Sequence, residues 1–193
     1  MRSLVLIAVA FSLSGCGGKN APLSAPSYDP DEMARAAVQQ YDKNGNGQIE
    51  GAELDACPAL KGALTAIDAN KDKAISVDEL TERFRAYKQG AVAVVGVACV
   101  VKLNNRPFEG ALVTFTPEDC MKGSVQGGSG TTDSSGAVAL DLPYGLYKIT
   151  VSRKSGAGEE LPARYNAATT LGREIGPDPR GAAGTIDLNL TSP

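Results

Sequence analysis

Two stretches of twelve residues decide how the first half of the chain folds: DKNGNGQIEGAE at 42–53 and DANKDKAISVDE at 68–79. Each begins with Asp, has oxygen-bearing side chains at its third and fifth positions, and ends in Glu. Carboxylate, amide and carbonyl oxygens are the ligands that Ca²⁺ prefers, and the ion takes about six to eight of them. The pattern therefore predicts two loops that each wrap around one ion, and its recurrence strengthens the prediction.

These stretches resemble the calcium loops of EF-hand proteins, in which the ion ligands stand at fixed positions. In the first loop the resemblance assigns this role to Asp42, Asn44, Asn46, the Gln48 carbonyl and Glu53. In the second it assigns the role to Asp68, Asn70, Asp72, the Ala74 carbonyl and Glu79. Ile49 and Ile75 occupy the eighth positions, where paired EF-hand loops join through a short β-bridge. Ca²⁺ is therefore the expected cofactor.

Both loops depart from the EF-hand pattern in ways that weaken an ion site. Lys73 stands where the family prefers Gly, and a left-handed Lys costs about 1–2 kcal/mol. Asn44 and Asn46 bring no charge to the first loop, so we expect weak sites of about 10⁻⁴ to 10⁻³ M. Two alternatives stay open. One is a degenerate pair that packs without metal, and the other is a dockerin-like pair, although dockerins favour Asp where Glu53 and Glu79 stand.

The segments around the loops have the spacing of amphipathic helices. Asp29 and Pro30 are typical of a helix start, and Pro58 predicts the start of a second helix. The apolar side chains recur at helical intervals in three sets: Met33, Ala37, Tyr41; Leu60, Leu64, Ile67; and Leu80, Phe84, Tyr87. We therefore expect a small all-α EF-hand pair over residues 30–90. A unit of this size is marginally stable alone, so a metal ion or a neighbouring domain must help.

From residue 91 the pattern changes to short alternating runs separated by turns, which is typical of β structure. Val95, Val97, Cys99, Val101 and Leu103 share one parity and are expected to face the core. The stretches RPFEGALVTFTP at 106–117, GTTDSSG at 130–136 and LPYGLY at 142–147 resemble carboxypeptidase-regulatory or transthyretin-like domains of bacterial envelope lipoproteins. The resemblance implies an antiparallel transthyretin-like β-sandwich over 91–193 and carries little chemistry. The expected fold class is therefore α+β in two parts.

The first residues predict export and a lipid anchor. An apolar run at 4–11 follows Met1 and Arg2, as in a signal peptide, which we assign to 1–15. Leu13-Ser14-Gly15-Cys16 resembles the lipobox of bacterial lipoproteins and implies acylation of Cys16. Residues 16–29 then form a lipidated flexible tether. The expected location is the cell envelope, at the outer membrane or a periplasm-facing membrane surface.

Composition excludes several classes of function. The chain has no His, which removes imidazole zinc sites, Ser-His-Asp and Cys-His nucleophiles, and the histidine chemistry of transthyretin-like hydrolases. The net charge of -3 predicts no binding to nucleic acid. A weak enzymatic alternative uses Glu109, Glu118 and Asp119, which we expect to be solvated loop charges. The chain is therefore expected not to be an enzyme.

Three cysteines remain once Cys16 is acylated, so at most one bridge can form within the chain. Cys99 and Cys120 share the predicted sandwich and are the favoured pair, which leaves Cys57 free. A buried, inert Cys99 thiol is the alternative.

Together these patterns predict a membrane-anchored envelope lipoprotein that binds calcium weakly through two EF-hand loops. Its β-sandwich would have a structural or binding role, with an envelope protein or polysaccharide as the expected partner. The alternative is a dockerin-like docking component of a surface or secreted enzyme system.

Overall fold

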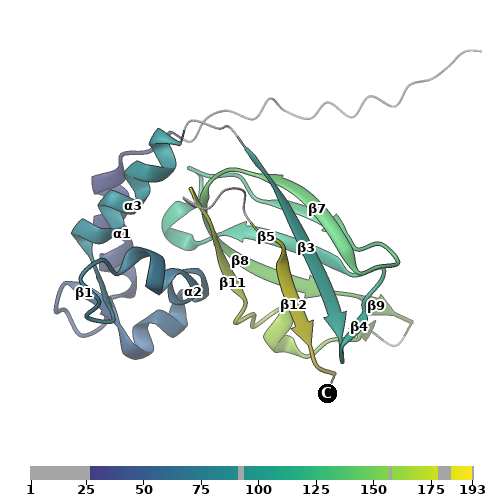
Figure 1. Ribbon diagram of the computed structural model, residues 1–193. Helices are drawn as coiled ribbons and strands as arrows, with labels where there is room; N and C mark the ends of the chain where they lie inside the picture. The colour runs from purple at the N-terminus through teal and green to yellow at the C-terminus, as the bar shows by residue number, and fades with distance from the viewer. Residues whose placement is uncertain (1–26, 91–93, 157, 178–183, 193) are drawn as a thin grey trace, which may run out of the picture.

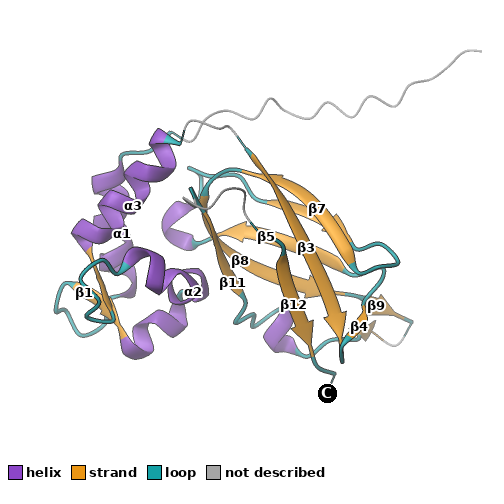
Figure 2. Cartoon of the chain, viewed as in Figure 1, coloured by secondary structure: helices purple, strands orange, loops and turns teal. Residues whose placement is uncertain are grey.

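The structure is a computed structural model that describes residues 27–90, 94–156, 158–177 and 184–192. A helical part covers residues 30–89, and a β-rich part begins at residue 95 (Figures 1 and 2). The predicted signal peptide, Cys16 and most of the predicted tether lie outside the described residues. Within the described ranges, no helix is long and apolar enough to cross a membrane.

The helical part contains α1 (Pro30–Tyr41), the 3-10 helix η1 (Gly51–Ala56), α2 (Pro58–Ile67) and α3 (Val77–Gln89). Asp29 caps α1 because its carboxylate accepts hydrogen bonds from the backbone N–H groups of Asp31 and Glu32. Pro30 and Pro58 stand at the first helical positions, as the sequence predicts. The first twelve-residue loop therefore joins α1 to η1, and the second joins α2 to α3.

The predicted apolar faces of the helices are buried, with the exception of one position. Buried members are Met33, Ala37, Tyr41, Leu60, Ile67, Leu80, Phe84 and Tyr87. Leu64 is only partly buried and packs against the edge of the core. The most extensive packing within this part is between α1 and α3, which lie side by side in Figure 1.

The β-rich part consists mainly of two sheets that face each other in the manner of a β-sandwich (Figure 2). One sheet has the order β11 (Gly172–Ile175), β8 (Gly145–Ser152), β5 (Leu112–Pro117), β6 (Gly128–Thr131). In the other, β3 (Val95–Leu103) pairs with β12 (Ile186–Leu190), β4 (Arg106–Pro107) and β7 (Ala137–Leu142). Val97, Cys99 and Val101 are buried as predicted, whereas Val95 and Leu103 are partly buried.

The expectation of a purely antiparallel sandwich is wrong at one strand pair. β12 runs parallel to β3, in a register that joins Ile186 to Cys99 and Leu190 to Leu103. Strands joined by a tight hairpin must be antiparallel, but β12 follows β11, which belongs to the other sheet. Because the chain crosses between sheets there, no hairpin fixes the direction of β12.

The helical part rests on the sheet through α2, which packs against β11. Two glycines allow the close approach: a Cβ on Gly172 would lie 2.2 Å from the Ala59 nitrogen, and one on Gly62 would lie 3.3 Å from the Gly172 oxygen. Beside them, Arg83 of α3 forms an ion pair with Glu174 of β11. The helical part therefore contacts the sheet mainly through α2 and β11, with the Arg83–Glu174 ion pair at the edge of this contact.

Candidate metal centre

The first loop folds around the carboxylates at its two ends. Asp42 accepts hydrogen bonds from the backbone N–H groups of Gly45 (2.6 Å) and Gly47 (2.8 Å). Glu53 accepts hydrogen bonds from the N–H groups of Lys43 (2.8 Å), Asn44 (3.1 Å) and Glu50 (3.1 Å). Both carboxylates therefore turn toward the backbone of the same loop.

The second loop repeats most of these contacts, with one difference: Asp68 accepts a hydrogen bond from the Asp72 N–H at position five (3.2 Å), whereas Asp42 accepts one from the Gly45 N–H at position four. Asp68 accepts a hydrogen bond from the Lys73 N–H (2.9 Å), as Asp42 does from Gly47. Glu79 accepts hydrogen bonds from the N–H groups of Ala69 (2.9 Å), Asn70 (3.4 Å) and Ser76 (2.9 Å). In both loops the final Glu thus bonds to positions two, three and nine.

The ligand candidates at positions three and five fold the backbone within each loop. Asn44 and Asn46 accept hydrogen bonds from the N–H group two residues on, at 2.9 Å in both cases. Asn70 and Asp72 do the same at 2.8 and 2.9 Å. Gln48 and Ala74 stand at position seven of their loops, where the backbone carbonyl is the candidate ligand. They are the first residues of the strands β1 (Gln48–Glu50) and β2 (Ala74–Ser76).

A short antiparallel ladder holds the two loops together. It pairs Ile49 with Ile75, and both side chains are fully buried. The resemblance predicts a bridge at this pair, and the strands lie at that place. The two loops therefore pair antiparallel through this ladder, and the first Asp and the final Glu of each loop lie outside it.

The backbone conformations also match between the loops. Gly45 and Gly47 have positive φ angles of 75° and 85°, and the equivalent Lys71 and Lys73 have 62° and 68°. The left-handed conformation expected for Lys73 is thus present. Lys71 adds a second left-handed residue that the sequence reasoning missed, although Gly45 at the same position of the first loop was a signal for it. The second loop carries conformational strain that the first avoids.

Hydrogen bonds within the loops favour the ionised form of three of the loop carboxylates. The hydrogen bond from the Gly47 N–H lowers the pKa of Asp42, and the bond from the Glu50 N–H lowers the pKa of Glu53. Partial burial acts to raise the pKa of Glu79, but the hydrogen bonds from Ser76 and Ala69 outweigh it and the pKa is lowered. All three groups are therefore in the anionic form that a hard cation binds.

Charged ligands are sparse around each loop. Within the described residues, no group of three or more His, Cys, Asp and Glu side chains lies together as a metal site would require. Every ligand set that the sequence predicts contains Asn side chains and a backbone carbonyl. An ion bound here would therefore depend on neutral oxygens as well as carboxylates, which favours Ca²⁺ over metals that prefer nitrogen or sulfur.

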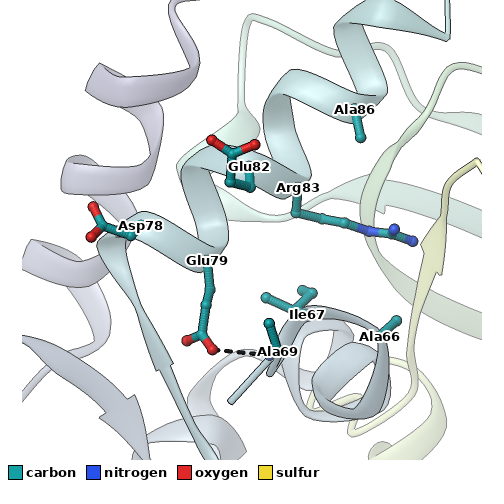
Figure 3. A pocket seen from close by; sticks show the side chains of 8 residues that line it. All are labelled: Ala66, Ile67, Ala69, Asp78, Glu79, Glu82, Arg83 and Ala86. Carbon is teal, nitrogen blue, oxygen red and sulfur yellow. Dashed lines mark hydrogen bonds between the residues drawn. The ribbon is translucent and has the colours of Figure 1, made fainter. Parts of the chain in front are cut away.

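A pocket of about 350 Å³ opens beside the second loop, between the end of α2 and the first turns of α3 (Figure 3). Its wall is apolar at Ala66, Ile67, Ala69 and Ala86 and charged at Asp78, Glu79, Glu82 and Arg83. The Glu79 carboxylate points toward the backbone of Ala69, as the dashed line in Figure 3 marks. The same Glu79 thus belongs to the loop and to the pocket wall.

The expectation that Glu118 is a solvated loop charge is wrong. The side chain is fully buried where α2 meets the sheet, and Oε1 accepts a hydrogen bond from the Ala59 N–H at 3.2 Å. Oε2 lies 3.3 Å from Nζ of Lys148, a contact that forms an ion pair without hydrogen-bond alignment. Burial raises the pKa of Glu118. The sequence could not show this because the burial comes from the docking of α2.

The favoured disulfide is also corrected, because Cys57, Cys99 and Cys120 are all free thiols. Cys99 lies in β3 inside the core, as the inert-thiol alternative expects. Cys120 lies in the 3-10 helix η2 (Asp119–Met121), which follows β5 in the opposite sheet and contacts α1. The two residues share the β-rich part but belong to different layers.

No family model matches the sequence, and no curated protein is similar to it. Among solved structures, a DUF3823 family protein from Parabacteroides merdae ATCC 43184 has 10% identity and a TM-score of 0.33, covering 51% of this chain and 45% of that chain. BcpA, the major pilin subunit of Bacillus cereus, has 13% identity and a TM-score of 0.34, covering 51% of this chain and 29% of that one. The matches span less than half the length of those proteins.

Proposed function

We propose that this chain binds Ca²⁺ weakly through two EF-hand loops and serves a structural or binding role in the cell envelope. One observation carries the proposal: in loops 42–53 and 68–79 the first and last carboxylates accept hydrogen bonds from backbone N–H groups at matching positions, and the same two positions are left-handed. Asp42 and Glu53 supply the charged ligands of the first loop, and Asp68, Asp72 and Glu79 supply those of the second. Asn44, Asn46 and the Gln48 carbonyl complete the first set, and Asn70 and the Ala74 carbonyl complete the second.

The position of the loops suggests what the ion does. Glu53 belongs to η1, which leads directly into α2, and Glu79 belongs to the first turn of α3. Both α2 and α3 contact β11, the first through Gly172 and the second through the Arg83–Glu174 ion pair. Calcium that fixes the loops would therefore also fix the helices that rest on the sheet.

The remaining parts of the proposal follow from the sequence. Acylation of Cys16 would hold the chain at a membrane of the envelope, with the helical pair and a transthyretin-like sandwich above it. The absence of His in the sequence favours a role without catalysis. The partner would be an envelope protein or polysaccharide. The dockerin-like alternative requires a free helical face, and α2 is partly covered by β11.

Calcium titration tests the proposal directly. The chain is titrated by calorimetry and melted with and without 10 mM Ca²⁺, where a site of about 1 mM would add about 1.4 kcal/mol. Glu53→Gln and Glu79→Gln are each expected to weaken one site about tenfold, because affinity follows the charge of the ligands. Asp141→Asn removes the same charge from an exposed position on β7 and should change nothing. Equal melting curves with and without Ca²⁺ would contradict the proposal.

The strain in the second loop gives a separate prediction. Lys73→Gly should stabilise the metal-free protein by about 0.5–1 kcal/mol. The substitution relieves about 1–2 kcal/mol of strain from the left-handed backbone, and the greater conformational entropy that Gly loses on folding offsets about 0.5–1 kcal/mol of this gain. The reciprocal Gly47→Lys should destabilise it by a similar amount, since a Cβ at Gly47 meets no atom within 4 Å and only the φ of 85° opposes it. Urea unfolding measures both, and shifts of the same sign would contradict the reasoning.

A further inference from the structure

Two cysteine thiols, one from each part of the chain, lie near the N-terminal end of α2. Cys57 immediately precedes α2 and is fully buried, and Cys120 lies half-buried in η2. The hydrogen bond from the Ala59 N–H to Glu118 joins a residue two after Cys57 to a residue two before Cys120. This contact brings the two short segments that carry the thiols against each other.

The surroundings of the thiols place them in one buried cluster with Tyr41 and Glu118. Burial, and then the nearby Glu118 and Cys120, raise the pKa of the Cys57 thiol. Burial raises the pKa of Tyr41, and the neighbouring Cys57, Cys120 and Glu118 raise it further. Within the described part of the chain, the Tyr41 hydroxyl and Oε2 of Glu118 are buried without an aligned hydrogen-bond partner.

Cys99 stands apart from this cluster. Its pKa is raised to about 11 by burial and by Asp187, a residue of the neighbouring strand β12. None of Tyr41, Glu118 or Cys57 is among the groups that affect it. Among the three described cysteines, Cys57 and Cys120 therefore form the pair with shared surroundings.

We propose that Cys57 and Cys120 form a disulfide that joins the helical part to the β-rich part when the protein meets a disulfide oxidant. In the cell the step rests on the export that the proposed function includes, because disulfides persist outside the cytosol. The oxidant is a small or protein disulfide. Two thiols of the chain become one disulfide, and the disulfide of the oxidant becomes two thiols, so atoms and electrons balance.

Exposure sets the order of the two exchanges. Cys120 is the less buried of the two residues, so its sulfur attacks the oxidant first and releases one oxidant thiol. Cys57 then attacks the Cys120 sulfur of the mixed disulfide, which breaks the bond to the oxidant and releases the second thiol. The Glu118 carboxylate beside Cys57 accepts the proton of that thiol. Burial raises the pKa of Cys120 to about 12, so the first exchange is slow at neutral pH and quickens as pH rises.

The test is peptide mapping of the full chain after incubation with oxidised glutathione. After digestion with trypsin and without reduction, the expected product joins peptide 44–61, which carries Cys57, to peptide 103–122, which carries Cys120. Cys99 and Cys16 fall in the separate peptides 89–102 and 3–19. A link from 103–122 to either of these, a lasting glutathione adduct on Cys120, or no reaction would overturn the proposal.

Single variants check the order and the consequence. Cys57→Ser should accumulate the glutathione adduct on Cys120, Cys120→Ser should take up none on Cys57, and Cys99→Ser should still form the link. The linked chain should melt about 10 °C higher than the reduced chain, because the bridge closes a long loop in the unfolded state. An unchanged melting temperature in the linked chain would contradict a bridge between the two parts. The oxidant is supplied and no calcium is needed, so failure here is independent of the calcium proposal.

Discussion

Gly172→Ala is expected to lower the melting temperature of the chain by about 10 °C. An added methyl group would stand 2.2 Å from the Ala59 nitrogen and 2.3 Å from the Pro58 carbonyl carbon, both backbone atoms that no side-chain rotation can move. The strand β11 and the helix α2 must therefore separate. Overpacking of this kind costs about 3 kcal/mol, and a chain of this size loses about 2–4 °C for each kcal/mol.

The separation should also be visible locally. Because α2 would be lifted from the sheet, limited proteolysis should cut residues 57–67 faster in Gly172→Ala than in the natural chain. Gly184→Ala is the matched control, since a Cβ there meets no atom within 4 Å. Gly62→Ala should have a much smaller effect, because its Cβ would lie 3.3 Å from the Gly172 oxygen, where a small shift accommodates it, and Ala favours the helix more than Gly does. If Gly172→Ala melts like Gly184→Ala, the close approach of α2 and β11 is wrong.

Glu118→Ala is expected to cost about 3 kcal/mol of stability. The variant leaves the Ala59 N–H without its acceptor at 3.2 Å and opens a cavity under α2. Glu118→Gln keeps an oxygen for that N–H and removes only the charge, so its loss should be much smaller. Urea unfolding of the three proteins separates the hydrogen bond from the charge.

The charge of Glu118 should appear as a pH dependence. Its pKa is raised in the folded state, so the folded chain holds this proton more tightly than the unfolded chain does. That contribution to stability is complete below the ordinary glutamate pKa of about 4.3 and is lost as pH rises through the raised value. The natural chain should therefore lose stability relative to Glu118→Gln as pH increases above this range. A constant difference between the two proteins from pH 4 to 8 would contradict the raised pKa. Lys148, Tyr41, Cys57 and Cys120 are the other groups around it, and the lysine ion pair limits the size of the effect.

Features set by neighbours in sequence were predictable. The Asp29 cap, the helix start at Pro58 and the inward parity of Val97 to Val101 depend on local backbone geometry, and each has the predicted place. The ligand roles of the loop residues rest on the resemblance to EF-hand loops and stay predictions. The pairing of Ile49 with Ile75 was predicted from the resemblance to paired EF-hand loops, and β1 and β2 pair at this position.

Features created by docking were not predictable. The sequence around Glu118 is typical of an exposed loop, and the side chain is buried because α2 packs against it. The sequence favours a Cys99–Cys120 pair because both residues share the predicted sandwich, whereas η2, which carries Cys120, contacts α1 of the helical part. The direction of β12 depends on a crossing between sheets that no local pattern encodes.

The parallel strand β12 has a consequence for how the chain leaves the ribosome. β3 is made about ninety residues earlier, and one of its edges stays uncovered until 186–190 emerge. The uncovered stretch, Cys99–Leu103, is an unpaired strand edge and therefore a ready template for pairing with a second molecule. Chains cut short before residue 186 should therefore precipitate rather than accumulate as soluble monomers, and a chaperone that shields β3 would be needed longest for this last step.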